Sequence, residues 1–176
     1  LVMKTTMKGY YEFMEGKPVS VHIAEIEQPD VPLWAIWALQ QYAKETSKEE
    51  CFKKYGQFIK DVISFIRGNK HPNLKLEENG LLYTDGKDKA VTWMNSTANG
   101  RPVVPRTGYI VEFNALWYNA LCFCASLAAT VGEEDSQQKL LAQAEQTKQA
   151  FLDTFLNEYG YLYDYVDGNM MDRSVR

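Results

Sequence analysis

The stretch Thr92–Leu121, "TWMNSTANGRPVVPRTGYIVEFNALWYNAL", decides how the rest of the chain is interpreted. Its first half carries the Gly, Pro, Arg and Asn residues that are typical of a shaped loop. Its second half begins a strongly apolar helix, predicted over residues 111–131. Three polar residues, Glu112, Asn114 and Asn119, stand among the large apolar and aromatic residues of this helix. A loop and a helix start with this composition indicate a site that holds a ligand.

Three further helices are predicted on either side of this stretch, over residues 32–47, 48–69 and 133–157, because apolar residues recur there at helical spacing. Ser47 followed by Glu50 is a capping signal for the second of them. The connection 71–108 has no helical period, although its turn pairs allow short hairpins. The sequence therefore predicts an all-α fold with antiparallel neighbours. Short connections alternate with long ones, as in a ring of helical hairpins with a ligand site at one end.

Composition excludes several classes of function. The 176 residues suffice for one domain with a core, and the net charge of -4, with both signs dispersed, offers no basic face for nucleic acid. Neither a signal peptide nor a membrane span is visible. Cys51, Cys122 and Cys124 fit buried thiols in a reducing compartment, and His22 and His71 lack the spacing of zinc ligands. We therefore expect a cytoplasmic protein with no metal site and no cofactor.

Three segments far apart in the chain share one kind of chemistry: 29–34, 92–119 and 161–172. All three lie at or near predicted helix ends, where they could meet over one opening. Aromatic rings stack on the apolar faces of sugars, while carboxylates, amides and guanidinium groups bind sugar hydroxyls. The candidate binding residues are Asp30, Trp34, Trp93, Asn95, Arg106, Glu112, Asn114, Trp117, Asp164 and Asp167. We expect these segments to converge around a saccharide.

Most of these residues also have a structural interpretation, which the sequence leaves open. Asp30 would suit a helix N-cap, Arg106 a clamp on its own loop, and Asp164 a turn. Glu112 lies in the first turn of its helix, where a carboxylate complements the helix dipole. Core packing is the alternative for the tryptophans, and we assign Trp37 to the core.

Three stretches resemble, in the same order, the C-terminal glucosidase domain of bacterial glycogen debranching enzymes. They are "PDVPLWAIWALQQY", "GLLYTDGKDKAVTWMNSTANGRPVVPRTGYIVEFNALWYNAL" and "GYLYDYVDGNMMDRSVR". The resemblance implies an (α/α)6 toroid, which is two concentric rings of helices with the active site at one end. It also implies amylo-α-1,6-glucosidase activity on the single-glucose branch stubs of glycogen. About half of the helices of such a ring can be counted and both chain ends look cut, so we expect residues 1–176 to form part of one toroid domain of a longer polypeptide.

The resemblance also implies roles for particular residues. Glu112 becomes the most important functional carboxylate, while the general acid of the family falls on the residue after Thr-Trp-Met, which is Asn95 here. An amide cannot deliver a proton at neutral pH, so another carboxylate would have to serve or Asn95 would only bind. The general base is expected beyond Arg176. The implied partner is glycogen or another branched α-glucan. The glucose pocket would be lined by Trp93, Asn95, Arg106, Asn114 and Trp117, with Asp30 and Trp34 in its wall.

Three alternatives remain open. The first is a non-catalytic α-glucan-binding toroid, and the second is another toroid glycosidase, of the glucoamylase or trehalase type. The third is a TPR-like interaction module, against which the long connection 71–108 argues. The exposed apolar surface of a partial ring would also favour pairing with a second copy, so a homodimer is a further expectation.

Overall fold

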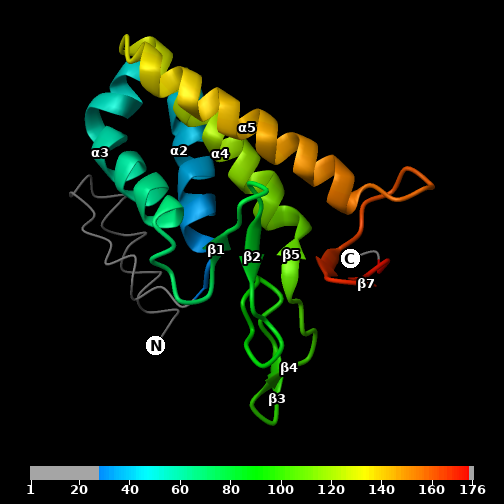
Figure 1. Ribbon diagram of the computed structural model, residues 1–176. Coiled ribbons are helices and arrows are strands. Elements are labelled where there is room, and N and C mark those ends of the chain that lie inside the picture. The colour runs from blue at the N-terminus through cyan, green and yellow to red at the C-terminus, as the bar shows by residue number, and fades with distance from the viewer. Residues whose placement is uncertain (1–27, 175–176) are drawn as a thin grey trace.

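The computed structural model describes residues 28–174. Within this range Figure 1 shows a group of helices above a set of short strands. The helices are α2 (Val31–Glu45), α3 (Lys48–Arg67), α4 (Val111–Thr130) and α5 (Glu134–Phe155). The strands are β1 (Lys75–Leu76), β2 (Leu82–Thr84), β3 (Thr97–Ala98), β4 (Arg101–Pro102), β5 (Gly108–Ile110), β6 (Tyr165–Asp167) and β7 (Met170–Met171).

The four predicted helices are confirmed, and each bound lies within two residues of its prediction. The capping signal before α3 is confirmed as well, because the Ser47 side chain accepts a hydrogen bond of 3.1 Å from the Glu50 N–H. Amphipathic spacing and a cap are local properties, and local properties are what a sequence pattern reports.

The predicted all-α class is wrong, because the chain is a mixed α and β structure, and nothing in residues 28–174 confirms the partial (α/α)6 toroid. Strands β1-β2-β5-β6-β7 form a five-stranded sheet in that order, and β3 and β4 form a separate two-stranded hairpin. Every pairing is antiparallel. Each strand has only two or three residues, too few to show the alternation by which strands are detected in sequence. The turn pairs of the connection 71–108 allowed hairpins, but they did not predict a sheet.

Helix α4 forms the centre of the core. It packs against α2, α3 and α5, and Figure 1 shows α5 running along it. The side chains of Phe113, Trp117 and Leu121 are fully buried on α4, and Leu33 and Ile36 of α2 are equally buried. Each large apolar side chain buried in this way stabilises the fold by about 1.5–3 kcal/mol. The core therefore fixes the direction of α4 and the position of its N-terminal end.

The sheet is attached to that end of α4. Strand β5 leads directly into the helix, and β6 pairs with β5 by placing Tyr165 opposite Ile110. Gly108 adopts a φ of 87°, and a Cβ at this position would overlap the Val166 carbonyl oxygen. Only glycine allows β6 to approach β5 so closely. Residues that follow α5 are in this way brought next to residues that precede α4.

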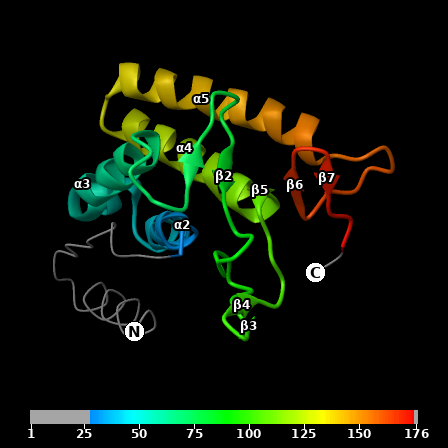
Figure 2. The same cartoon turned by 60° about the horizontal axis from the view of Figure 1, so that its bottom comes forward.

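The β3–β4 hairpin projects away from the helices and the sheet, as both Figure 1 and Figure 2 show. Its strands are exposed, with Pro102 alone partly covered. The hairpin therefore adds little to the core and presents its surface to solvent.

Two further expectations can be compared with the structure. All three cysteines are free thiols, and Cys51 and Cys124 are buried as expected, whereas Cys122 is partly exposed. Between residues 28 and 174 no helix is both long and apolar enough to cross a bilayer.

Candidate functional site

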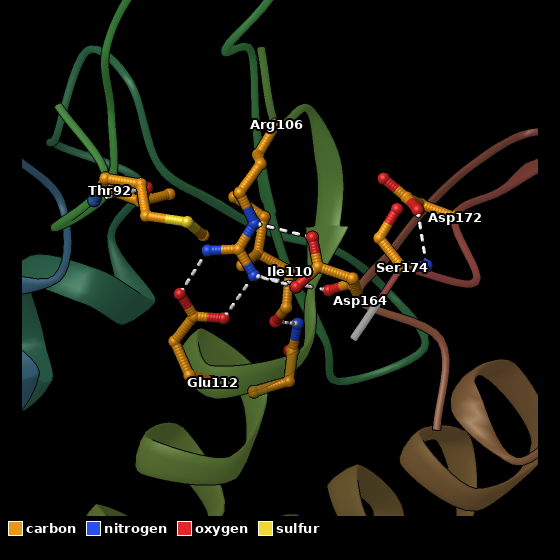
Figure 3. Close-up of polar contacts among 9 residues, drawn as sticks. Thr92, Arg106, Ile110, Glu112, Asp164, Asp172 and Ser174 are labelled. Carbon is orange, nitrogen blue, oxygen red and sulfur yellow. Dashed lines mark hydrogen bonds and ion pairs between the residues drawn. The ribbon is translucent and has the colours of Figure 1, made fainter. Parts of the chain in front are cut away.

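One buried guanidinium joins two carboxylates at the N-terminal end of α4 (Figure 3). Arg106 is only 2% exposed, and its Nε and Nη2 donate to Asp164 Oδ2 and Oδ1 at 2.9 and 2.7 Å. Its Nη1 and Nη2 donate to the two carboxylate oxygens of Glu112, the second at 2.6 Å. Arginine is suited to such paired contacts, because its planar fork matches two oxygens of one carboxylate. We call these three residues the Arg106 cluster.

Backbone geometry positions each member of the cluster. Glu112 lies in the first turn of α4, and Asp164 directly precedes β6. The carbonyl of Asp164 accepts a hydrogen bond of 3.1 Å from the Val111 N–H, which fixes the 164 segment against the helix start. A Cβ at Gly86 would overlap the Arg106 carbonyl oxygen, so the connection 85–91 can pass Arg106 only with glycine there. In the sequence Asp85-Gly86 is one of the turn pairs of the connection 71–108, and that pattern does not reveal this close approach.

The cluster carries more negative than positive charge. One guanidinium faces two carboxylate groups, so the formal sum is negative when all three are ionised. Burial lowers the pKa of Arg106, but the hydrogen bonds and charges of Glu112 and Asp164 outweigh this effect and raise it above its usual value. Arg106 therefore stays charged. Removing one partner from a buried ion pair costs about 3–5 kcal/mol, because the remaining charge stays buried without compensation.

Asp30 brings a third carboxyl group to this region. It is 3% exposed, and its Oδ1 has no hydrogen-bond partner in the part of the chain that the structure describes. Burial raises its pKa to about 6, while hydrogen bonds to its own backbone and to the Trp34 side chain oppose that rise. The charge of Glu112 raises this pKa further and that of Arg106 lowers it, which places Asp30 within electrostatic range of the cluster.

The structural alternative for Asp30 can now be judged. Asp30 occupies the N-cap position of α2, yet within the described residues its side chain makes no capping hydrogen bond. A buried carboxyl oxygen without a partner is costly and uncommon in folded proteins. Capping therefore does not explain why an aspartate lies here.

Two tryptophans of α2 lie on the surface. Trp34 and Trp37 are each 42% exposed, and their rings meet edge to face with centroids 5.8 Å apart. The assignment of Trp37 to the core is wrong, because the buried side of α2 is formed by Leu33, Ile36 and Leu39. The helix carries apolar residues on more than one side, so its pattern alone did not show which side faces inward.

Asn114 and Trp117 lie beneath the site. Asn114 Oδ1 accepts from the Leu82 N–H at 2.7 Å, and its Nδ2 donates to the carbonyls of Leu82 and Ile110 at 3.1 and 3.0 Å. These bonds fasten β2 to the first turn of α4. Trp117 is fully buried in the core, and its Nε1 has no partner among residues 28–174. Neither side chain has surface with which to contact a ligand, so we leave both out of the proposed site.

The side chains of Trp93 and Asn95 are exposed to solvent. Thr92 is buried, and its Oγ1 accepts a hydrogen bond of 3.2 Å from the Met94 N–H. Trp93 is 60% exposed, and Asn95 is exposed on the segment that leads into the β3–β4 hairpin. The structure thus joins Arg106, Glu112 and Asp164 by hydrogen bonds, with Asp30 within electrostatic range, and leaves Trp93 and Asn95 at the surface.

Asp167 is held by a separate set of contacts. The Tyr83 hydroxyl donates to Asp167 Oδ1 at 3.1 Å, and Lys87 Nζ lies 3.6 Å from Asp167 Oδ2. These contacts tie β6 to β2 and to the connection that follows β2. Asp167 therefore has a structural role at the edge of the region.

The domain carries a carboxylate-rich cluster at the N-terminal end of α4. Comparison with known families identifies the class of protein to which the domain belongs. The chain matches the amylo-alpha-1,6-glucosidase family over residues 22–176 and therefore belongs to that family. This confirms the resemblance to the glycogen debranching enzymes and makes the chain a glycosidase domain of the debranching type. Comparison with curated proteins and with solved structures gave no significant match.

Proposed function

We propose that the protein is a glycoside hydrolase that releases α-1,6-linked glucose branch stubs from glycogen, with branched α-glucan as its substrate. One observation carries this proposal within the family. Carboxylates from two separate segments bind one buried guanidinium, and Asp30 from a third segment lies within electrostatic range of it, so charged groups that can bind sugar hydroxyls are concentrated in one region. Three free thiols fit a reducing compartment, and we infer that the protein acts in the cytoplasm.

Glu112 is the proposed functional carboxylate. Its side chain is 23% exposed, whereas those of Arg106 and Asp164 are 2% and 8% exposed, so Glu112 is the member of the cluster most open to solvent. Arg106 holds this carboxylate in one orientation, with two hydrogen bonds. A carboxylate held in this way can bind a sugar hydroxyl or stabilise the positive charge that develops when a glycosidic bond breaks.

Asp30 and the exposed aromatic residues complete the proposed site. A sugar hydroxyl that donates to Asp30 Oδ1 would satisfy an atom that is buried and has no partner among residues 28–174. Trp34 and Trp93 offer exposed ring faces on which a glucose ring can stack. We assign Asn95 a binding role, because an amide cannot act as the general acid.

Replacement of one atom tests the proposal. Glu112→Gln keeps the shape of the side chain and removes its charge, and we expect glucose release from a branched limit dextrin to fall on the order of 10²-fold. Glu133→Gln is the matched control, because Glu133 pairs with Lys60 at the surface turn before α5. Release within a few-fold of the parent would remove Glu112 from the reaction.

A non-catalytic α-glucan-binding protein is the second candidate function. Asn95 at the family's acid position favours it, since the proton donor expected there is absent. This candidate predicts that the parent protein binds branched dextrin and releases no glucose. Measuring dextrin binding and glucose release on the same preparation separates the two functions.

A further inference from the structure

A cavity adjoins the Arg106 cluster at Asp164. It has a volume of about 520 Å³, and its lining includes Asn157, Tyr159, Tyr161, Tyr163, Asp164 and Arg173. We call it the tyrosine pocket. Its volume lies within the range of about 300–1,000 Å³ that is usual for sites of small ligands. In Figure 1 the turn that carries Tyr159 and Tyr161 follows the end of α5 and stands out at the right.

The two most exposed rings of this pocket are carried by a turn whose backbone is held by hydrogen bonds. Tyr159 and Tyr161 are 70% and 72% exposed. Asn157 Oδ1 accepts hydrogen bonds from the Tyr159 and Tyr161 N–H groups at 2.9 and 3.0 Å, and the Asn157 N–H donates to the Tyr161 carbonyl at 2.9 Å. A bridge between Leu156 and Leu162 closes the base of the turn. A turn held in this way loses little conformational entropy when a ligand binds.

Polar groups form the other side of the pocket. Arg173 Nη2 lies 3.3 Å from Glu158 Oε1, and its guanidinium stands 5.8 Å from the centre of the Tyr163 ring. The segment that carries Arg173 is fastened to Asp164, whose N–H donates to the Asp172 carbonyl at 2.8 Å. Aromatic faces beside fixed hydrogen-bonding groups match a sugar, which has an apolar ring face and a rim of hydroxyls.

Asp164 belongs to both regions. It lines the tyrosine pocket and accepts two hydrogen bonds from Arg106. The pocket therefore adjoins the site proposed for the branch stub, so one polymer chain can reach both regions.

We propose that the tyrosine pocket binds a linear stretch of α-glucan, separate from the branch stub held at the Arg106 cluster. This inference rests on the proposed function, because that function makes a glucan the ligand next to the pocket. Holding one polymer at two points raises the effective concentration of its branch stub at the cluster. Long glucans should therefore bind more tightly than short ones.

Binding of maltoheptaose, a linear probe without a branch, tests the proposal by isothermal titration calorimetry. We expect Tyr159→Ala and Tyr161→Ala each to weaken Kd several-fold and the double variant to weaken it about tenfold. Tyr161→Phe keeps the ring face and should bind nearly as the parent does. Leu141→Ala removes an exposed apolar side chain from α5 outside the pocket and should leave Kd unchanged. Both tyrosines are exposed, so circular dichroism and thermal unfolding of the variants should match the parent.

Three results would overturn the pocket as a glucan site. They are a parent that does not bind maltoheptaose, a folded double variant that keeps the parental Kd, and a double variant that changes only self-association in sedimentation. The proposed function has its own readout, which is glucose release from branched limit dextrin by the parent. Glucose release with an unchanged Kd in the double variant rejects the pocket alone. Tyrosine-dependent binding without glucose release rejects the hydrolase alone.

Discussion

The two halves of Thr92–Leu121 carry the same residue types in opposite environments. Trp93 and Asn95 in the first half are exposed, whereas Trp117 and Asn114 in the second half are fully buried. The Trp117 indole fills part of the core on the buried side of α4. The Asn114 amide binds backbone groups of Leu82 in β2 and of Ile110 before α4. Whether a side chain supports the fold or is open to solvent therefore does not depend on its residue type. It depends on the partners that distant segments of the chain supply.

The tryptophans should show the largest difference. Trp117→Ala leaves a cavity in the core, and we expect it to lower the free energy of unfolding by about 3–5 kcal/mol. Trp93→Ala removes an exposed ring and should change that free energy by no more than about 0.5 kcal/mol, while weakening glucan binding. Urea denaturation of both variants measures the two free energies of unfolding. Equal losses would contradict the assignment of Trp117 to the core and Trp93 to the surface.

The next difference extends the comparison to buried and exposed carboxyl groups. The pKa of Asp30 is raised from 3.8 to about 6, so the folded protein holds this proton more tightly than the unfolded chain. Ionised Asp30 therefore costs stability above about pH 6, and the cost disappears below the unfolded value of 3.8. At pH 8 this cost is about 3 kcal/mol.

Asp30→Asn should accordingly unfold at a higher urea concentration than the parent at pH 8, and the two proteins should converge as the pH falls toward 4. Asp88→Asn changes an exposed carboxylate on the connection after β2 and is the matched control. If Asp30→Asn raises the urea midpoint by the same amount at pH 8 and at pH 4, ionisation of Asp30 is not the cause of the added stability.

The asparagines should show the smallest of the three contrasts. Asn114→Ala leaves the Leu82 N–H and carbonyl without their buried partner, and we expect a loss of about 2 kcal/mol. Asn95→Ala should lie within about 0.5 kcal/mol of the parent. Thermal unfolding of the two variants side by side decides the point, and an Asn95→Ala protein that unfolds as early as Asn114→Ala would contradict it.

Local features of the fold could be predicted from the sequence, and non-local ones could not. The Ser47 cap and the four helices depend on residues within a few positions of one another, and all were found. Strand β5 has three residues, and its partner β6 comes from a segment beyond two helices. No short pattern in the chain contains that pairing, so the sheet was missed.

The candidate site was predictable in kind and less so in membership. A carboxylate at a helix start and an arginine in a Pro-rich loop are visible as residue types. That Arg106 binds an aspartate 58 residues further along the chain is a consequence of tertiary packing. The burial of Asn114 likewise depends on Leu82 of β2, which sequence analysis treated as part of a loop.

The span between Arg106 and Asp164 also has a consequence for the order of folding. Contacts between residues so far apart are slow to form, because the intervening chain must first lose its conformational freedom. Helices α4 and α5 lie in this interval and pack against each other as neighbours, which shortens the effective distance. We expect this helical pair to form early and the contacts of the Arg106 guanidinium to form afterwards. The end of the domain that carries the Arg106 cluster would then fold last and open first when the protein begins to unfold.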